Sequence, residues 1–491
     1  MNEPSLDAAN AGGGPAWRRG LAFLTVALMG LSFNLGYYLF HWLPGPLFKL
    51  LPGGLQHHLE AEKPLYFSPL DALLPLLLLV LAWDLFKGRI RDWALPLPNL
   101  LWALAALVSF AWVDSGGRGS WFKSALLQTG LVAVCGVWAF RHFMRDLKTA
   151  RALALVLGAS LGVCLLAALY QYAAPVGRPL KPGEHDLALA GGYTNLRVSG
   201  WYDYRGQLAA QVAMLVPACV ALLALGRDPA ARIAAGAAAM VGLCVCLSGG
   251  GVIGASAGVL AVAAALWSSR QHLPCGPLQT TPGWKAILIA FGLVAALGVV
   301  LPLLPRKNPE ALWDSLTLYR KVDTEKGKRA METARLRRHQ AALALLSDRH
   351  AWKKGVGAGG FQSAVNVHYD DLAYPKPGAN TDDEAAFDQD ADEPFSFGLY
   401  ETTAVELGIG GLLAVVFVYL AWAGAALAAF LKSAEDDARM LALASLGAAA
   451  GAAVFSIFGH PLVRGCGGTW AFFMGLALFL NARASEQAAN R

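Results

Sequence analysis

Charged residues are scarce in this sequence. Only 15% of its 491 residues are Asp, Glu, Lys or Arg, whereas 56% are hydrophobic. A soluble globular domain rarely combines so little charge with so much apolar surface. Residues 1–15 are polar and glycine-rich, and the apolar run after Arg18 and Arg19 is too long for a signal peptide, so we expect no cleavable signal. This composition argues against a soluble protein and indicates one embedded in a membrane.

Cysteines and metal-ligand patterns are also few. Of the seven cysteines, only Cys466 is predicted to lie near the outer surface, so we expect no disulfide framework. The outer loops show no His, Asp or Glu grouping at ligand spacing, apart from an acidic stretch at 382–393 whose spacing matches no calcium loop. We therefore expect an activity that needs neither a metal nor a cofactor.

Long apolar runs are the feature that the sequence has in abundance. Each is near the length of about twenty residues that a helix needs to cross the hydrocarbon core of a bilayer. We predict an all-α polytopic membrane protein with about twelve spans. The predicted spans are 20–43, 69–86, 98–114, 121–140, 151–173, 206–226, 232–248, 251–268, 285–304, 402–431, 439–459 and 467–482.

Lys and Arg in the short loops predict the orientation, because such loops are usually cytoplasmic. The alternate loops, such as 114–120, carry less positive charge. Both termini are therefore predicted to be cytoplasmic, with the loops 174–205 and 305–401 outside. The chain divides into spans one to nine (1–304), a large outer loop (305–401) and the last three spans with a tail (402–491). The loops predicted to share the cytoplasmic face are 18–19, 87–92, 141–151, 226–232, 268–272 and 432–439.

The large outer loop separates its charges along the sequence. Residues 306–354 contain thirteen Lys or Arg against six Asp or Glu, whereas residues 370–393 contain nine acids against one Lys. The acidic part has the composition of a solvated segment. As a functional alternative, this acidic part would act as a gate or as a docking surface for an amine-bearing sugar.

The basic part of this loop predicts an amphipathic helix. Arg335, Arg338 and His339 lie at positions i, i+3 and i+4, so they share one face. The glycine-rich stretch 355–361 is expected to end the helix, because glycine adopts positive φ without strain. Arginines beside such a turn suit a phosphate group. Contact with lipid headgroups, or a solvated basic face, explains the charge equally well.

A second basic cluster occurs in the other outer loop. Arg197 and Arg205 lie at the mouth of the sixth predicted span, with Trp201 and Tyr202 between them. Aromatic residues at this depth often belong to the interfacial belt. Together with arginines they also suit an anionic glycan carried on a lipid, with the rings stacking on sugar.

Three stretches carry a resemblance to a known family. Residues 196–217 (LRVSGWYDYRGQLAAQVAMLVP), 334–361 (ARLRRHQAALALLSDRHAWKKGVGAGGF) and 400–413 (YETTAVELGIGGLL) are similar, in order and position, to motifs of the O-antigen ligase and O-antigen polymerase superfamily. The resemblance covers roughly residues 190–415. In the last stretch the matching residues are Glu406, Gly408 and Gly411.

The sequence also departs from the family pattern. Phe397 and Gly398 stand where the family has a His-Asn pair, and His339 stands where it usually has tryptophan. The role of activating the acceptor is therefore not transferred from the family. Glu401, an ionisable residue predicted at the membrane surface, and His339, which titrates near neutral pH, are the candidates.

The resemblance implies a GT-C-like fold in the bacterial inner membrane. It also implies transfer of a glycan from undecaprenyl diphosphate to a sugar hydroxyl of another glycan or of lipid A core, on the periplasmic side. Stabilising the leaving diphosphate requires fixed positive charge, which arginines supply. The predicted catalytic residues are Arg335, Glu401 and His339. The predicted diphosphate ligands are Arg197, Arg205 and Arg338, and the predicted glycan contacts are Trp201, Tyr202 and Tyr400.

Two other functions remain open. A flippase or transporter of lipid-linked glycans would use similar basic sites, although transporters usually carry ionisable residues within their spans. A peptidoglycan-type polymerase would need a carboxylate in the large loop, which Asp370 or Asp371 supplies. Between the two O-antigen activities, the missing His-Asn pair favours a polymerase over a ligase.

Overall fold

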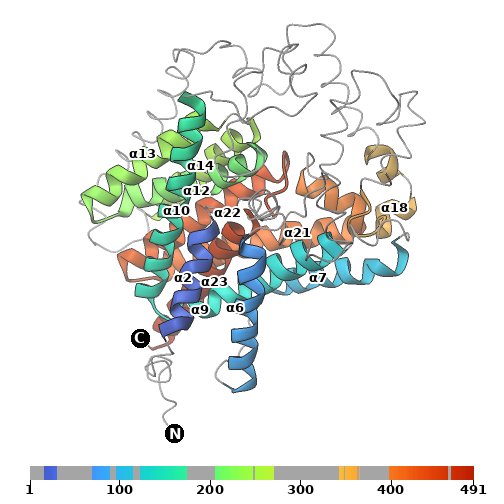
Figure 1. Cartoon of the computed structure of the whole chain (residues 1–491), viewed down its shortest axis with the longest axis horizontal. Helices are drawn as coiled ribbons and strands as arrows, with labels where there is room; N and C mark the ends of the chain where they lie inside the picture. Colours follow the sequence, from blue (N-terminus) through green and yellow to red (C-terminus); the bar gives the residue numbers. More distant parts are fainter. Residues whose placement is uncertain are drawn as a thin grey trace, which may run out of the picture.

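The computed structural model describes residues 16–29, 69–88, 95–113, 122–173, 205–246, 249–269, 342–347, 349–361, 364, 398–462 and 466–490 (Figure 1). These residues are helical or lie in turns, and no strand occurs among them, which confirms the all-α prediction for this part of the chain. The helices are α2 (Ala16–Met29), α6 (Pro69–Phe86), α7 (Leu97–Val108), η1 (Ser109–Trp112), η3 (Phe122–Gly136), α9 (Val137–Phe143), α10 (Leu147–Ala173), α12 (Arg205–Leu225), α13 (Pro229–Val245), α14 (Gly249–Ser269), α18 (Arg349–Lys354), α21 (Leu399–Lys432), α22 (Asp436–Phe455) and α23 (Cys466–Ala489).

Several of these helices have the length and composition of membrane spans. The five that are long and apolar enough to cross a membrane are α10, α12, α14, α21 and α22, and α6, α7 and α13 contain shorter apolar stretches. A membrane-embedded helical protein follows from this pattern. The total of twelve spans and the GT-C-like arrangement stay predictions. The predicted span 285–304 and most of the loop 305–401 lie outside the described residues.

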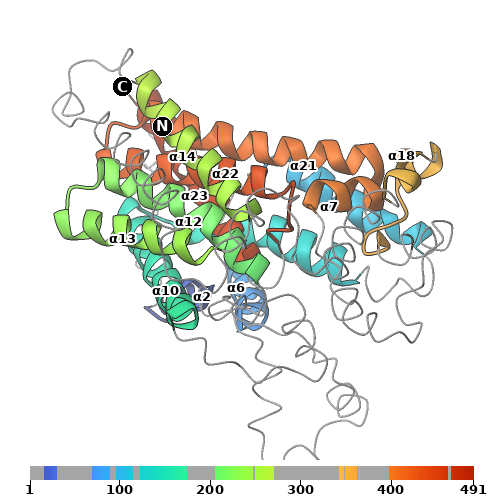
Figure 2. The ribbon, with the colours of Figure 1, turned by 90° about the horizontal axis from the view of Figure 1, so that it is seen from above.

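Helices α12, α14 and α22 pack against one another at the centre of the bundle (Figures 1 and 2). Glycines make this close approach possible. A Cβ on Gly258 of α14 would overlap the ring of Pro217 and press on the carbonyl oxygen of Gly447. A Cβ on Gly451 of α22 would overlap the carbonyl oxygen of Ala213. Small residues at helix interfaces let backbones approach closely, which is how apolar helices associate in a membrane.

A second group of contacts joins α21, α22 and α23 through aromatic residues whose polar atoms are paired. The indole of the buried Trp422 donates to the Ser445 hydroxyl at 2.9 Å. The indole of Trp470 donates to the Tyr419 hydroxyl at 3.2 Å, and that hydroxyl is 2.7 Å from the hydroxyl of Ser456. Since an unpaired polar group is costly inside an apolar bundle, these bonds favour one arrangement of the three helices.

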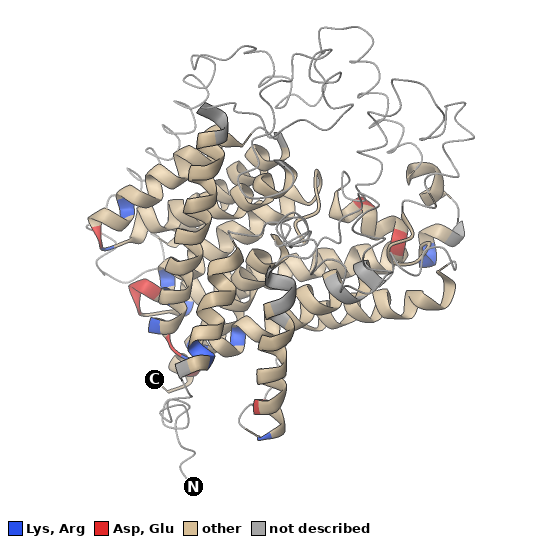
Figure 3. Cartoon of the chain, in the orientation of Figure 1, with Lys and Arg blue, Asp and Glu red and all other residues tan. Residues whose placement is uncertain are grey.

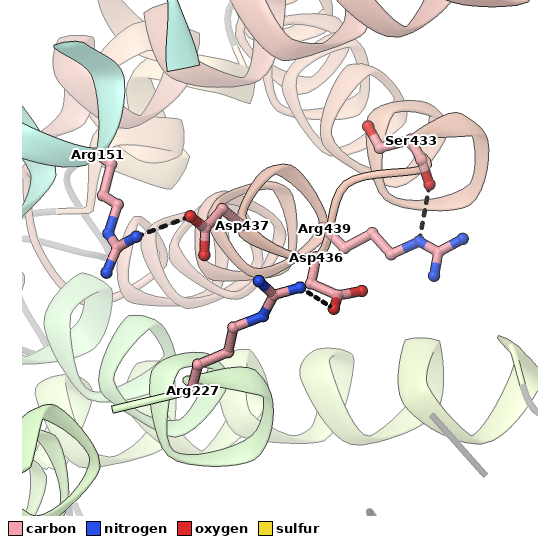
Figure 4. Close-up of polar contacts among 6 residues, drawn as sticks. All are labelled: Arg151, Arg227, Ser433, Asp436, Asp437 and Arg439. Carbon is pink, nitrogen blue, oxygen red and sulfur yellow. Dashed lines mark hydrogen bonds and ion pairs between the residues drawn. The ribbon is translucent and has the colours of Figure 1, made fainter. Parts of the chain in front are cut away.

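The loop between α21 and α22 gathers arginines from three other parts of the chain. Glu435 is the N-cap residue of α22, and Asp436 and Asp437 lie in its first turn. The helix dipole favours negative charge at this end. The three ion pairs are Glu435 with Arg483 at 3.0 Å, Asp436 with Arg227 at 2.7 Å and Asp437 with Arg151 at 2.8 Å, the last two drawn in Figure 4.

These ion pairs show that loops predicted to share one face do meet. The segments 141–151, 226–232 and 432–439 are brought together, at the end of the bundle away from α18 (Figure 3). The hydrogen bond from Arg483, followed by that from Gln487, lowers the pKa of the Glu435 carboxyl. All three pairs are at least partly exposed, so water weakens each of them. Their assignment to the cytoplasmic side stays a prediction.

Among the described residues, the ion pair between Arg18 and Asp84 is buried. A single guanidinium nitrogen of Arg18 lies 2.6 Å from both carboxylate oxygens of Asp84, and the two side chains are 10% and 4% exposed. The pair joins the start of α2 to the end of α6. Removing either partner would leave an uncompensated buried charge, so the contact fixes these two helices relative to each other.

The glycine packing predicts a difference between two Gly→Ala substitutions. Gly451→Ala is expected to lower the Tm of the detergent-solubilised protein, because overpacking a tight contact costs about 1–3 kcal/mol. In the control Gly424→Ala, on α21, no atom lies within 4 Å of the added Cβ. That change is expected to be neutral or to stabilise by up to about 1 kcal/mol. Equal Tm shifts in the two variants would contradict the close packing of α22.

The predicted orientation can be tested with cysteines introduced at Lys354, the last residue of α18, and at Ala434, just after the end of α21. Ser433 is a poor labelling site because it is only 3% exposed, whereas Ala434 and Lys354 are exposed. A membrane-impermeant maleimide applied to intact cells is expected to label Lys354→Cys and to spare Ala434→Cys. Labelling of position 434 alone would place the basic segment in the cytoplasm.

Candidate functional site

Helix α21 is interrupted near its start. Gly408 has φ 66° and ψ −165°, which separates residues 399–407 from the long remainder of the helix. The positive φ favours glycine, and a Cβ here would lie 2.7 Å from the carbonyl oxygen of Lys353 in α18. The break therefore brings the end of α18 into direct contact with α21, as the two views of these helices show (Figures 1 and 2).

A glycine-rich turn, residues 355–361, follows α18. Gly355 ends the helix with φ 72°, and its N–H donates to the Ala351 carbonyl at 2.8 Å. Gly357 and Gly359 also have positive φ, at 100° and 74°. The sequence correctly predicts that the glycines end this helix, because left-handed residues after a helix are a common C-terminal cap.

The turn binds the backbone of α21 beside the break. The N–H groups of Val356 and Gly357 donate to the carbonyls of Val405 and Glu406 at 2.9 and 2.8 Å. An unbroken helix would pair those two carbonyls with its own N–H groups four residues on. The break at Gly408 interrupts that ladder, and the turn supplies donors in its place.

The carboxylate of Glu406 lies under the same turn. The residue is 6% exposed. Its carboxylate accepts hydrogen bonds from the backbone N–H groups of Gly359 and Phe361, and from the Ser124 hydroxyl of η3 at 3.3 Å. A carboxylate held by backbone amides makes charge-assisted bonds, which are stronger than those between neutral groups.

All of the amides in the turn are engaged. Besides those already described, the N–H of Ala358 donates to the Ser109 hydroxyl at 2.9 Å and that of Gly360 donates to the Gly357 carbonyl at 2.9 Å. Every N–H of 355–361 already has a partner in the chain, so the turn itself offers no free amide to a phosphate. The prediction that the arginines beside the turn bind a phosphate stays a prediction. Any phosphate contact would have to come from the side chains around it.

The structure places three of the nine predicted site residues. Arg205 begins α12, and Tyr400 and Glu401 lie in the first turn of α21. Tyr400 and Glu401 are half-buried, and the ring of Tyr400 packs edge-on against Tyr419 with centroids 6.0 Å apart. The remaining residues lie outside the described part of the chain: Arg197, Trp201, Tyr202, Arg335, Arg338 and His339.

The helical residues before the turn are held by a small apolar cluster. Ala342 and Leu345 pack with Phe361 of the turn and Val405 of α21. Arg335 precedes Ala342 by seven positions, so the basic segment leads directly into this docked region. On the surface next to it, Trp352 is 41% exposed and Lys353 and Lys354 are exposed.

The sequence matches Glu406 to a family motif without a role, whereas the predicted catalytic carboxylate is Glu401. The signal was present, since Glu406 is a carboxylate inside an apolar run next to several glycines. An ionisable residue in such a run is a functional hypothesis by default. Its burial and its partners from the turn could not be read from the sequence, because they come from residues about fifty positions away.

The role of the break in α21 can be tested with a second matched pair of substitutions. Gly408→Ala is expected to release the turn, because the new Cβ is strained at φ 66° and presses on α18. The readout is faster trypsin cleavage between Lys353 and Lys354. In the control Gly410→Ala, no atom lies within 4 Å of the added Cβ, and cleavage is expected at the normal rate. Normal cleavage in Gly408→Ala would show that the break does not hold α18.

Comparison with known proteins assigns no family to the chain. A scan against protein-family models finds no match, and a search of curated proteins finds none either. Among the residues described by the structure, no group of three His, Cys, Asp or Glu side chains is arranged to hold a metal ion. The function must therefore be argued from the residues of the chain itself.

Proposed function

We propose that the chain transfers a glycan from undecaprenyl diphosphate to a sugar hydroxyl, as an O-antigen or exopolysaccharide polymerase or an O-antigen ligase of the bacterial inner membrane. One observation carries the proposal. The segments 334–361 and 400–413, which bear the resemblance to those enzymes, are joined by backbone hydrogen bonds and by the Glu406 carboxylate.

The distribution of charge supports a lipid-linked anionic substrate. Residues 306–354 are strongly basic, and their last part docks at the end of α21 opposite the acidic loop 433–437. We assign the docked end to the periplasm and the acidic loop to the cytoplasm. A basic segment anchored beside the membrane surface suits a diphosphate whose lipid tail stays in the bilayer.

In the proposed reaction the bond between the anomeric carbon of the donor sugar and the phosphate oxygen breaks. Negative charge then develops on the diphosphate, which leaves on its lipid. The guanidinium groups of Arg197, Arg205, Arg335 and Arg338 stabilise that charge, and fixed charges act most strongly where water is excluded. Among them Arg335 is the strongest candidate, because it occupies a matching motif position.

The acceptor hydroxyl forms the new bond to the anomeric carbon and gives up its proton. Glu401 or His339 receives the proton, and Tyr400 with Trp201 and Tyr202 contacts the sugars. Glu401 suits this role better than Glu406, because it is half-buried in the first turn of α21. The oxygens of Glu406 are buried and already bonded to the turn and to Ser124.

A transporter of lipid-linked glycans is the second candidate. The observation that favours it is the buried carboxylate of Glu406 within α21, since ionisable residues inside spans often serve transport. The two functions differ in their product. Purified protein in lipid, given a lipid-linked oligosaccharide, forms a longer or transferred glycan only if it is an enzyme.

Substitutions of Arg335 test the proposed chemistry. Arg335→Lys keeps the charge but loses the bidentate geometry, so turnover is expected to fall sharply. Arg335→Ala is expected to lower turnover further, by about 10³-fold, as for other donors that stabilise developing charge. Product formation at matched expression is the measurement, and Arg349→Ala is the control expected to retain activity.

The alternative explanation, attraction of the basic segment to anionic headgroups, gives a different pattern. Charge alone would then matter, so Arg335→Lys would behave as the wild type and Arg349→Ala would lose as much as Arg335→Ala. Near-normal turnover in Arg335→Ala would remove the diphosphate role of this residue.

A further inference from the structure

Two amides of the glycine-rich turn converge on one anion. The N–H groups of Gly359 and Phe361 both donate to the Glu406 carboxylate. Gly359 has a positive φ of 74°, and backbone amides that such a residue turns toward one point form a concavity that binds carboxylates and phosphates. The other amides of the turn bond to other acceptors.

Glu406 contacts three separate parts of the chain. It belongs to the short arm of α21 before Gly408, its carboxylate binds the turn, and Ser124 of η3 donates to it at 3.3 Å. Its donors among the described residues are two amides and one hydroxyl, all uncharged. A carboxylate accepts hydrogen bonds on both oxygens, whereas a glutamine would turn an NH2 group toward a donor.

Besides the backbone bonds of Val356, Gly357 and Ala358, a small apolar cluster holds the docked segment. The apolar cluster beneath it consists of Ala342, Leu345, Phe361 and Val405, with a few partly buried neighbours. A cluster of this size buries little apolar area, so hydrogen bonds supply much of the specificity of docking. The Glu406 carboxylate supplies side-chain hydrogen bonds from α21 to the turn, in addition to the backbone bonds.

We propose that Glu406 is a positioning residue, whose carboxylate binds the amides of Gly359 and Phe361 and so fixes the turn 355–361, and α18 before it, relative to α21. The docking role stands on the contacts above. Its importance for catalysis rests on the proposed function, because it acts through the arginines that precede the turn. Glu406 itself does not touch the reacting atoms, since its oxygens are buried and engaged.

Hydrogen exchange of the full-length protein in detergent tests the docking role. In Glu406→Gln the peptide covering 355–361 is expected to exchange about tenfold faster or more, because bonds to a charged acceptor are lost. Peptides from α22 should keep their protection. Glu401→Gln, a matched change one turn away, should leave 355–361 unaltered. Unchanged exchange of 355–361 in Glu406→Gln would overturn the proposal.

A second variant covers the case in which Glu406→Gln does not fold. Ser124→Ala removes only the hydroxyl donor, so a smaller acceleration is expected, confined to 355–361. No acceleration, or one spread evenly through the bundle, would overturn the docking role.

Activity separates the docking role from the function. In the glycan-transfer assay Glu406→Gln is expected to lower kcat, and combining it with Arg335→Ala should cost little beyond Arg335→Ala alone, because both act through one contact. A wild-type protein that forms no product would remove the proposed function and leave the exchange result standing. Faster exchange of 355–361 with an unchanged kcat would overturn the positioning role.

Discussion

Backbone hydrogen bonding across the break in α21 is the constraint on which the candidate site depends. A helix in an apolar environment can be interrupted only where other groups satisfy its freed carbonyls and amides. Here two amides of the turn 355–361 donate to the backbone carbonyls of Val405 and Glu406. Two further amides of the turn donate to the side-chain carboxylate of Glu406. Each feature therefore requires the other: the break exposes acceptors, and the glycines shape a turn that reaches them.

The two ends of the bundle are held by different chemistry. At one end, Glu435, Asp436 and Asp437 pair with arginines in partly exposed positions, where water weakens each pair. At the other end, the carboxylate of Glu406 is buried and bonded to uncharged donors. Salt should affect the first set of contacts much more than the second, because only exposed charges are well screened.

The sequence predicts the helices well because their signals are local. Apolar runs locate α10, α12, α14, α21 and α22, and Gly355 marks the end of α18. Positive charge in short loops predicts which segments meet at the loop 433–437. It does not predict which arginine pairs with which carboxylate there.

The candidate site was only partly predictable, because its contacts join residues far apart in the chain. The bond between Gly357 and Glu406 and that between Ala358 and Ser109 leave no trace in local periodicity. The sequence predicts that the glycines end the helix and that the arginines beside them bind a phosphate. It does not predict that a carboxylate of the chain binds the amides of Gly359 and Phe361. The sequence favours Glu401 over Glu406 because depth in a span can be estimated from sequence, whereas burial under a distant turn cannot.

The glycine contacts among α12, α14 and α22 have a mechanical consequence. Because backbone touches backbone at Gly258 and Gly451, these helices cannot slide or rotate without collision. They form a stationary block, and neither a lipid chain nor a sugar fits between them. Any movement that admits a substrate must therefore take place outside this block.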